Sequence, residues 1–253
     1  MCCIFSFLGF EVYRKSKRNK IKFDSSQKPL YIEFLGVPGV GKSTIFNALQ
    51  KKEKFWLTVN EHNNSLKKHQ RVKFDKNSAE QRLAEQRWKY LTEKNYLPTD
   101  KLRVAYWNYV ILNSDALLQK NNKNSIVLSD EGMVLSFSDA IMDLENKDSN
   151  LLDDFLKNRA FVYCTARPDV ILKRIESRRK QTGKVVAQHK TKSNQELLEI
   201  ISQETKERDN LVDFLKRRNK PLLVIDTSEE LDKNLSKILT FIREFQHKEN
   251  INT

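Results

Sequence analysis

Residues 36–43 read Gly-Val-Pro-Gly-Val-Gly-Lys-Ser, and these residue types at this spacing suit the binding of a triphosphate. The glycines of such a G-x-x-x-x-G-K-[ST] segment let the chain turn so tightly that successive backbone N–H groups point at phosphate oxygens. Lys42 would contact the β- and γ-phosphates, and the Ser43 hydroxyl would ligate Mg²⁺. We therefore predict that the chain binds a nucleoside triphosphate. The predicted contact residues are Gly36, Val37, Pro38, Gly39, Val40, Gly41, Lys42, Ser43 and Thr44.

The flanking segments support this interpretation. An apolar run at 30–35 precedes the glycine-rich segment, and apolar residues at helical spacing follow it, among them Ile45, Phe46 and Leu49. A strand before and a helix after are the context in which such a loop binds phosphate. A chance glycine-rich turn would need neither.

Two acidic residues, Asp130 and Glu131, follow the apolar run at 126–128, the third such run in the chain. A carboxylate at that point holds Mg²⁺ directly or through water in proteins with this kind of phosphate loop, so we predict Asp130 as a metal ligand with Ser43. The alternative for Asp130 is a cap on the following segment. Glu131 would orient water in an ATPase, face the acceptor in a kinase, or pair with an arginine, and the sequence leaves these open.

Other charged residues are candidates for catalysis. Glu61 follows the apolar run 55–59 and could accept a proton from an acceptor hydroxyl. Arg174 and Arg178 are four residues apart in a basic helix predicted from Pro168 to about residue 180, so they share one face. From such a basic lid they would neutralise charge on the transferred phosphoryl group.

Arginines and tryptophans occur together on two predicted helices, 78–94 and 98–119: Arg82, Arg87, Trp88, Arg103 and Trp107. One interpretation is an acceptor that has both a ring and an anionic group. The other places the tryptophans in the core, and on the second helix we expect Leu102, Tyr106, Tyr109, Val110 and Leu117 to point inward.

Short apolar runs alternate with helical segments along the chain. The predicted strands are 30–35, 55–59, 126–128, 161–164 and 222–225, and further helices are predicted at 149–157, 193–218 and 229–247. This alternation predicts an α/β fold with a mostly parallel sheet of about five strands between two helical layers. Ligands of such sheets bind beyond the carboxyl ends of the strands, where the candidate residues lie.

The composition agrees with one domain and a short basic extension. The chain has 253 residues, 39% of them hydrophobic, and only six glycines and five prolines, so we predict one domain at 30–247, an arm at 1–29 and a tail at 248–253. No apolar run is long enough to span a bilayer, and the three cysteines suggest neither disulfides nor a zinc site. A cytoplasmic location fits best.

The net charge is +13, and residues 14–28 are strongly basic. Such an arm can attract nucleic acid, anionic membrane surfaces or phosphorylated ligands, and charge alone does not choose among them. A homodimer is equally compatible with the sequence.

The layout resembles the P-loop nucleotide kinases, specifically the thymidylate kinase and deoxynucleoside kinase-like group. The resemblance covers roughly residues 30–247 and rests on the loop at 36–43, on Asp130, and on the segments YCTARPDVILKRIESRRK and VIDTSEELDKNLSKILTFI. It implies a P-loop NTPase fold with a three-layer α/β/α arrangement and a basic helical lid. It also implies ATP and Mg²⁺ handled by Lys42, Ser43 and Asp130, with Arg174 and Arg178 in the lid.

The chain departs from this family at the acceptor side. The family usually has an arginine after the acid at the position of Glu131, and its acceptor motif after the second strand is missing from 55–64. We therefore expect an ATP-dependent phosphotransferase whose small-molecule acceptor, nucleotide-like or sugar-like, differs from an ordinary nucleoside. The alternatives are a P-loop ATPase or nucleotide-dependent regulator using Asp130 and Glu131, and a protein that binds or phosphorylates nucleic acid.

Overall fold

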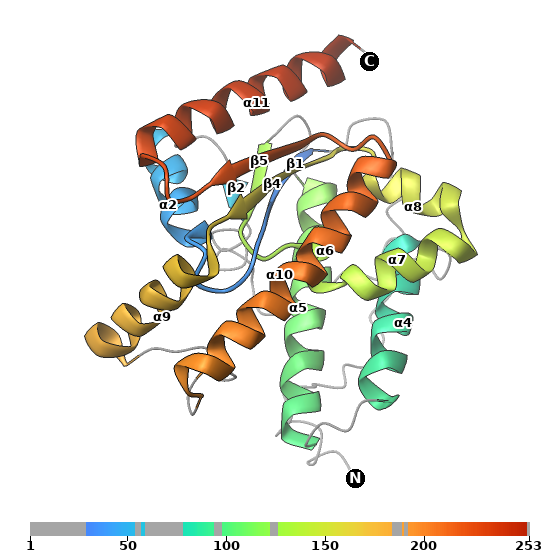
Figure 1. Ribbon diagram of the computed structural model, residues 1–253. Helices are drawn as coiled ribbons and strands as arrows, with labels where there is room; N and C mark the ends of the chain where they lie inside the picture. The colour runs from blue at the N-terminus through green and yellow to red at the C-terminus, as the bar shows by residue number, and fades with distance from the viewer. Residues whose placement is uncertain are drawn as a thin grey trace.

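The computed structural model describes residues 29–53, 57–58, 78–93, 98–121, 126–183, 189 and 192–251. Its centre is a parallel sheet in the order β2-β3-β1-β4-β5 (Figure 1). The strands are β1 (Leu30–Leu35), β2 (Leu57–Thr58), β3 (Ile126–Ser129), β4 (Arg159–Thr165) and β5 (Leu222–Asp226). The predicted α/β fold with about five strands is confirmed. Of the strand predicted at 55–59, only 57–58 lies within the described residues.

The described helices are α2 (Lys42–Lys52), α4 (Ala79–Glu93), α5 (Pro98–Asn121), α6 (Met133–Ser136), α7 (Ser138–Lys147), α8 (Ser149–Leu156), α9 (Pro168–Thr182), α10 (Asn194–Arg217) and α11 (Leu231–Ile251). The sequence did not predict α6 and α7. The last helix also runs four residues beyond its predicted end, into the segment expected to be a tail. No helix of the described part is both long and apolar enough to cross a membrane.

The two faces of the sheet are covered by different helices (Figure 1). Along β4, Ala160, Val162 and Cys164 pack with α2, α9 and α11, whereas Phe161 and Tyr163 pack with α4 to α8. This follows from the strand period of two, which sends alternate side chains to opposite faces. Helix α10 contributes its first half to one core and its second half to the other.

Sequence signals mark both ends of α9, the candidate lid, and the start of the next helix, α10. Pro168 occupies the first turn of α9, and Gly183 ends the helix in the left-handed conformation, with φ of +63°. Ser193 and Glu196 form a capping box at the start of α10, because each side chain bonds the other residue's backbone N–H. The basic helix predicted from Pro168 is therefore present as α9, with its end at Gly183.

The prediction for the buried face of α5 is wrong over its first half. Leu102, Tyr106 and Tyr109 are exposed, whereas the segment 112–118 is buried. Trp88 and Trp107 are each 56% exposed, which rules out the core interpretation of these tryptophans. The reason is that the N-terminal half of α5 projects beyond the sheet, so the apolar side chains there have no sheet to pack against (Figure 1).

Candidate active site

The predicted phosphate loop lies between the end of β1 and the start of α2. Gly36 has φ of +139°, and a Cβ atom there would lie 2.6 Å from the carbonyl oxygen of Cys164 in β4. Gly39 has φ of +86°, and its Cβ position is 2.9 Å from Ile175 of α9. Only glycine tolerates both the left-handed backbone and this close packing, so the tight turn expected from the sequence is present.

Lys42 opens α2 and turns its ammonium back over this loop. Its Nζ donates to the carbonyl oxygens of Gly36, at 2.6 Å, and Val37, at 3.1 Å. Burial lowers the pKa of Lys42, while the nearby carboxylates of Glu131 and Asp130 act in the opposite direction. The cation is therefore held at the loop and faces the acidic pair that follows β3.

Strand pairing brings the acidic pair to the phosphate loop. Strands β1 and β3 are parallel neighbours with Glu33 opposite Ser129, so both strands end at the same edge of the sheet. Asp130 is half-buried and Glu131 is exposed. Partial desolvation of its carboxylate and the adjacent Asp130 raise the pKa of Glu131, and Lys42 lowers it. Lys42 and both acids therefore lie at the same edge of the sheet.

The oxygen donors at this edge suit magnesium. Ser43 is exposed on the first turn of α2, and the Asp130 carboxylate lies at the end of the neighbouring strand. Hydroxyl and carboxylate oxygens are hard ligands, and Mg²⁺ in phosphate sites takes only one or two from the protein. No cluster of three or more potential metal-binding side chains occurs within the described ranges, so a cation here would depend on substrate phosphates and water.

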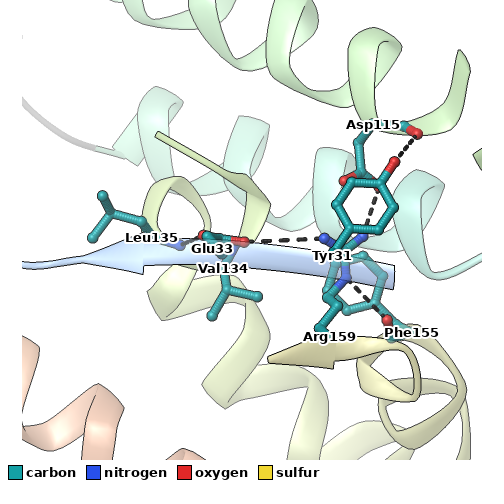
Figure 2. Close-up of polar contacts among 7 residues, drawn as sticks. All are labelled: Tyr31, Glu33, Asp115, Val134, Leu135, Phe155 and Arg159. Carbon is teal, nitrogen blue, oxygen red and sulfur yellow. Dashed lines mark hydrogen bonds and ion pairs between the residues drawn. The ribbon is translucent and has the colours of Figure 1, made fainter. Parts of the chain in front are cut away.

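A buried carboxylate, Glu33, fixes the backbone immediately after the acidic pair. Its Oε1 accepts from the N–H of Leu135 at 2.7 Å and its Oε2 from the N–H of Val134 at 3.2 Å, both at the start of α6 (Figure 2). Burial raises the pKa of Glu33 to about 7, against the opposing effects of Arg159 and the two N–H groups. Glu33 therefore positions the turn that carries Glu131.

Arg159 connects this carboxylate to α5. Its guanidinium lies 4.0 Å from the Glu33 carboxylate, donates to Asp115 at 2.7 Å, and stacks 4.5 Å from the Tyr31 ring centroid. The Tyr31 hydroxyl donates to the backbone oxygen of Asp115 (Figure 2). These side chains lie on one face of the sheet because Tyr31 pairs in register with Arg159, two residues before Glu33. Their charges are paired, as buried charges require.

The predicted lid arginines have different environments. Arg174 donates to the carbonyl oxygen of Val40 at 2.5 Å and to Thr227 at two atoms, each at 2.8 Å. The Thr227 hydroxyl contacts the same Val40 oxygen. Arg174 therefore ties the phosphate loop to the turn after β5. Arg178, one turn later, is exposed.

A cavity of about 290 Å³ lies beside Glu131. Its wall includes Glu131 together with Arg87 of α4, Trp107 and Asn108 of α5, and Arg208 of α10. Arg208 also lies near enough to Lys42 to lower the pKa of that ammonium. Another hollow, of about 410 Å³, is lined by α10 alone and contains none of the predicted site residues.

The structure thus brings together the loop 36–43, Asp130, Glu131 and Arg174. Arg82, a candidate for acceptor binding, forms an ion pair with Asp148. Glu61 and the basic arm lie outside the described residues. The sequence analysis missed Glu33 and Arg208. An acid inside the apolar run of β1 was a usable signal for Glu33, since such residues are buried only when paired. Arg208 lies in a highly charged helix and offered no signal.

Comparison with known proteins gives structural likeness only. The sequence matches no family model, and a search of curated proteins finds no match. Shikimate kinase from Bacteroides thetaiotaomicron is similar with a TM-score of 0.46 and 14% identity, over 85% of this chain and 98% of that chain. Deoxyadenosine kinase from M. mycoides gives 0.45 and 17%, over 85% and 100%. A gluconokinase from Sinorhizobium meliloti gives 0.42 and 13%, over 90% and 99%. These identities and TM-scores are too low to carry an argument about function, so the comparisons do not identify the acceptor. The fold is supported by the chain's own strand order and phosphate loop.

Proposed function

We propose that the protein is a phosphotransferase that moves the γ-phosphoryl group of Mg·ATP to a small-molecule acceptor. A single observation supports this best: Glu131 lies close enough to Lys42 of the phosphate loop to interact with its charge, and the same residue lines a cavity. A phosphate site next to a cavity of small-molecule size is the arrangement that a kinase needs, because donor and acceptor must be held in line.

The residues divide the work as follows. Backbone N–H groups of 36–43 and the Lys42 ammonium bind the phosphates. Ser43 and Asp130 would hold Mg²⁺, which would supply positive charge at the phosphoryl oxygens. Glu131 accepts the proton of the acceptor hydroxyl while that oxygen bonds to the γ-phosphorus and the bond to the ADP oxygen breaks.

Arg174 contributes by shaping the phosphate loop. Since its guanidinium is already bonded to Val40 and Thr227, we assign it to holding the loop in its binding conformation. Arg178 is the better candidate for a direct phosphate contact, because its side chain is exposed on the same helix. The role of Glu61 near the acceptor stays a prediction.

The second candidate is an ATPase. Its support is the exposure of Glu131, which gives water access to a carboxylate next to the phosphate site. In that case Glu131 orients the attacking water rather than an acceptor hydroxyl.

An assay that follows the γ-phosphate separates the two functions. Purified protein is incubated with Mg·ATP labelled at the γ-phosphate, with and without cell metabolite extract and with nucleosides and nucleotides as defined acceptors. Label in a new phosphorylated product supports the kinase, whereas release only as inorganic phosphate, unchanged by extract, supports the ATPase. Lys42→Ala should abolish both, and Lys51→Ala, an exposed lysine of the same helix, should leave activity unchanged.

A further inference from the structure

The cavity beside Glu131 collects positive charge from two helices. Arg87 of α4 and Arg208 of α10 line it, and Glu131 is an acid in the same wall. Arg87 has a carboxylate partner, Asp139, but their closest atoms are 3.6 Å apart and Asp139 is half exposed. No ion pair of Arg208 is formed within the described ranges. Arg208 therefore brings a positive charge to this wall without a carboxylate partner among the described residues.

The cavity also collects polar atoms that have no hydrogen-bond partner. Three side chains of the wall each have such an atom: the Nε of Arg87, the Nδ2 of Asn108 and the Nε of Arg208. All three atoms are hydrogen-bond donors, and a guanidinium group contains no acceptor atom of its own. Buried donors without partners are uncommon in folded proteins, and each calls for an explanation. Rotation of these side chains toward the cavity would let a ligand oxygen accept from them.

From these observations we propose that the acceptor carries an oxyanion, a carboxylate or a phosphate, which Arg87 and Arg208 bind while Asn108 donates to it. This inference rests on the proposed kinase function and adds the chemical class of the substrate. An oxyanion matches the donors in both sign and number, because it offers several acceptor lone pairs to planar guanidinium groups. A neutral sugar would offer the guanidinium donors of this wall no charged acceptor. The exposed ring of Trp107 borders the same cavity, so its fluorescence reports on occupancy.

Binding can be tested without turnover. Protein saturated with Mg²⁺ and a non-hydrolysable ATP analogue is titrated with inorganic phosphate and, separately, with acetate, at constant ionic strength kept with chloride. Saturation of the analogue blocks the phosphate loop, so tryptophan fluorescence and calorimetry then report the second site. We expect at least one of the two anions to bind, and the stronger one indicates whether the acceptor's group is a phosphate or a carboxylate.

Variants locate the bound anion. Arg208→Gln and Arg87→Gln should each weaken its binding about 10- to 100-fold, as expected for loss of a charge-assisted hydrogen bond. Arg208→Lys should recover part of the affinity, which would show that Arg208→Gln fails through lost charge rather than lost folding. Arg217→Gln, an exposed arginine of α10, and Lys89→Gln, an exposed lysine of α4, are the matched controls and should leave binding unchanged. The proposal is wrong if neither anion binds to the loaded protein, or if Arg208→Gln and Arg87→Gln bind as well as the controls.

The phosphoryl-transfer assay provides a second test of this proposal. Metabolite extract is separated on an anion-exchange resin, and each fraction is offered with labelled Mg·ATP. We expect the acceptor in the retained, anionic fraction, and Arg208→Gln should raise its KM while the KM for ATP stays the same. An acceptor in the unretained fraction, or a change confined to ATP, overturns the proposal and leaves the kinase function intact. Hydrolysis without transfer in any fraction overturns the kinase function and with it the assignment of an acceptor, whereas the anion titration separately shows whether Arg87 and Arg208 bind an oxyanion.

Discussion

Replacement of Gly132 by alanine should destabilise the protein through a clash with Glu33. Gly132 has an ordinary extended backbone, with φ of −93°, so the constraint on it is space and not conformation. A Cβ atom there would lie 2.3 Å from Cδ of Glu33 and 2.5 Å from its Oε2, where ordinary contacts begin at 3.4 Å. Relief therefore needs a movement of about 1 Å. Both hydrogen bonds of the carboxylate, at 2.7 and 3.2 Å, would then exceed bonding distance.

The expected magnitude follows from the two ways to relieve the clash. Shifting the turn against a packed core costs about 1–3 kcal/mol, and breaking a hydrogen bond to a charged group costs about 1.5–3 kcal/mol. We expect the free energy of unfolding of Gly132→Ala to fall by about 3 kcal/mol. For a chain of this size, that lowers Tm by about 6–12 °C.

Urea unfolding followed by circular dichroism measures this change, and a double-mutant cycle isolates its cause. Glu33→Ala removes the three atoms that the new Cβ would contact, namely Cγ, Cδ and Oε2 of Glu33. Arg159 keeps Asp115 as its partner in this variant. In that background Gly132→Ala should cost less than about 0.5 kcal/mol. Equal costs of Gly132→Ala in both backgrounds would refute the clash as the cause.

Three further predictions concern the site. Glu131→Gln should lower kcat about 100-fold or more, while the Kd for ATP changes less than about threefold. Steady-state kinetics and calorimetry measure these two values, and an unchanged kcat would remove this residue from the mechanism. Thr227→Val should lower the free energy of unfolding by about 1–2 kcal/mol and raise the KM for ATP, because it removes the hydroxyl between Arg174 and Val40. An unaltered KM for ATP would contradict the role of Arg174 in shaping the phosphate loop. The third concerns pH: the pKa of Glu33 is raised from 4.5 to about 7, so the folded protein binds this proton more tightly than the unfolded chain does. Its contribution to stability is therefore full below pH 4.5 and is lost as the pH rises through about 7. Glu33→Gln should flatten this part of the pH dependence of urea unfolding, and an unchanged slope would show that another group causes it.

Much of the fold was predictable because its signals are local. The apolar runs of β1, β3, β4 and β5 are short and bounded, and the period of two along them determines which side chains share a face. The phosphate loop was equally plain, since Gly36 and Gly39 are required by backbone geometry within a few residues. Helix α6 was missed because four residues give too few turns for a clear helical period, and α7, which follows it after one residue, was missed with it.

The sequence by itself therefore determined the phosphate loop, the acidic pair and the alternation of strands and helices, all of which depend on residues close in the chain. Tertiary structure decided which side chains meet across elements. It placed Trp107 at the surface, buried Glu33 against α6, and brought Arg208 from a charged helix to the cavity beside Glu131. The physical reason is that burial and pairing depend on which helix covers which part of the sheet, and neither residue type nor spacing encodes that packing.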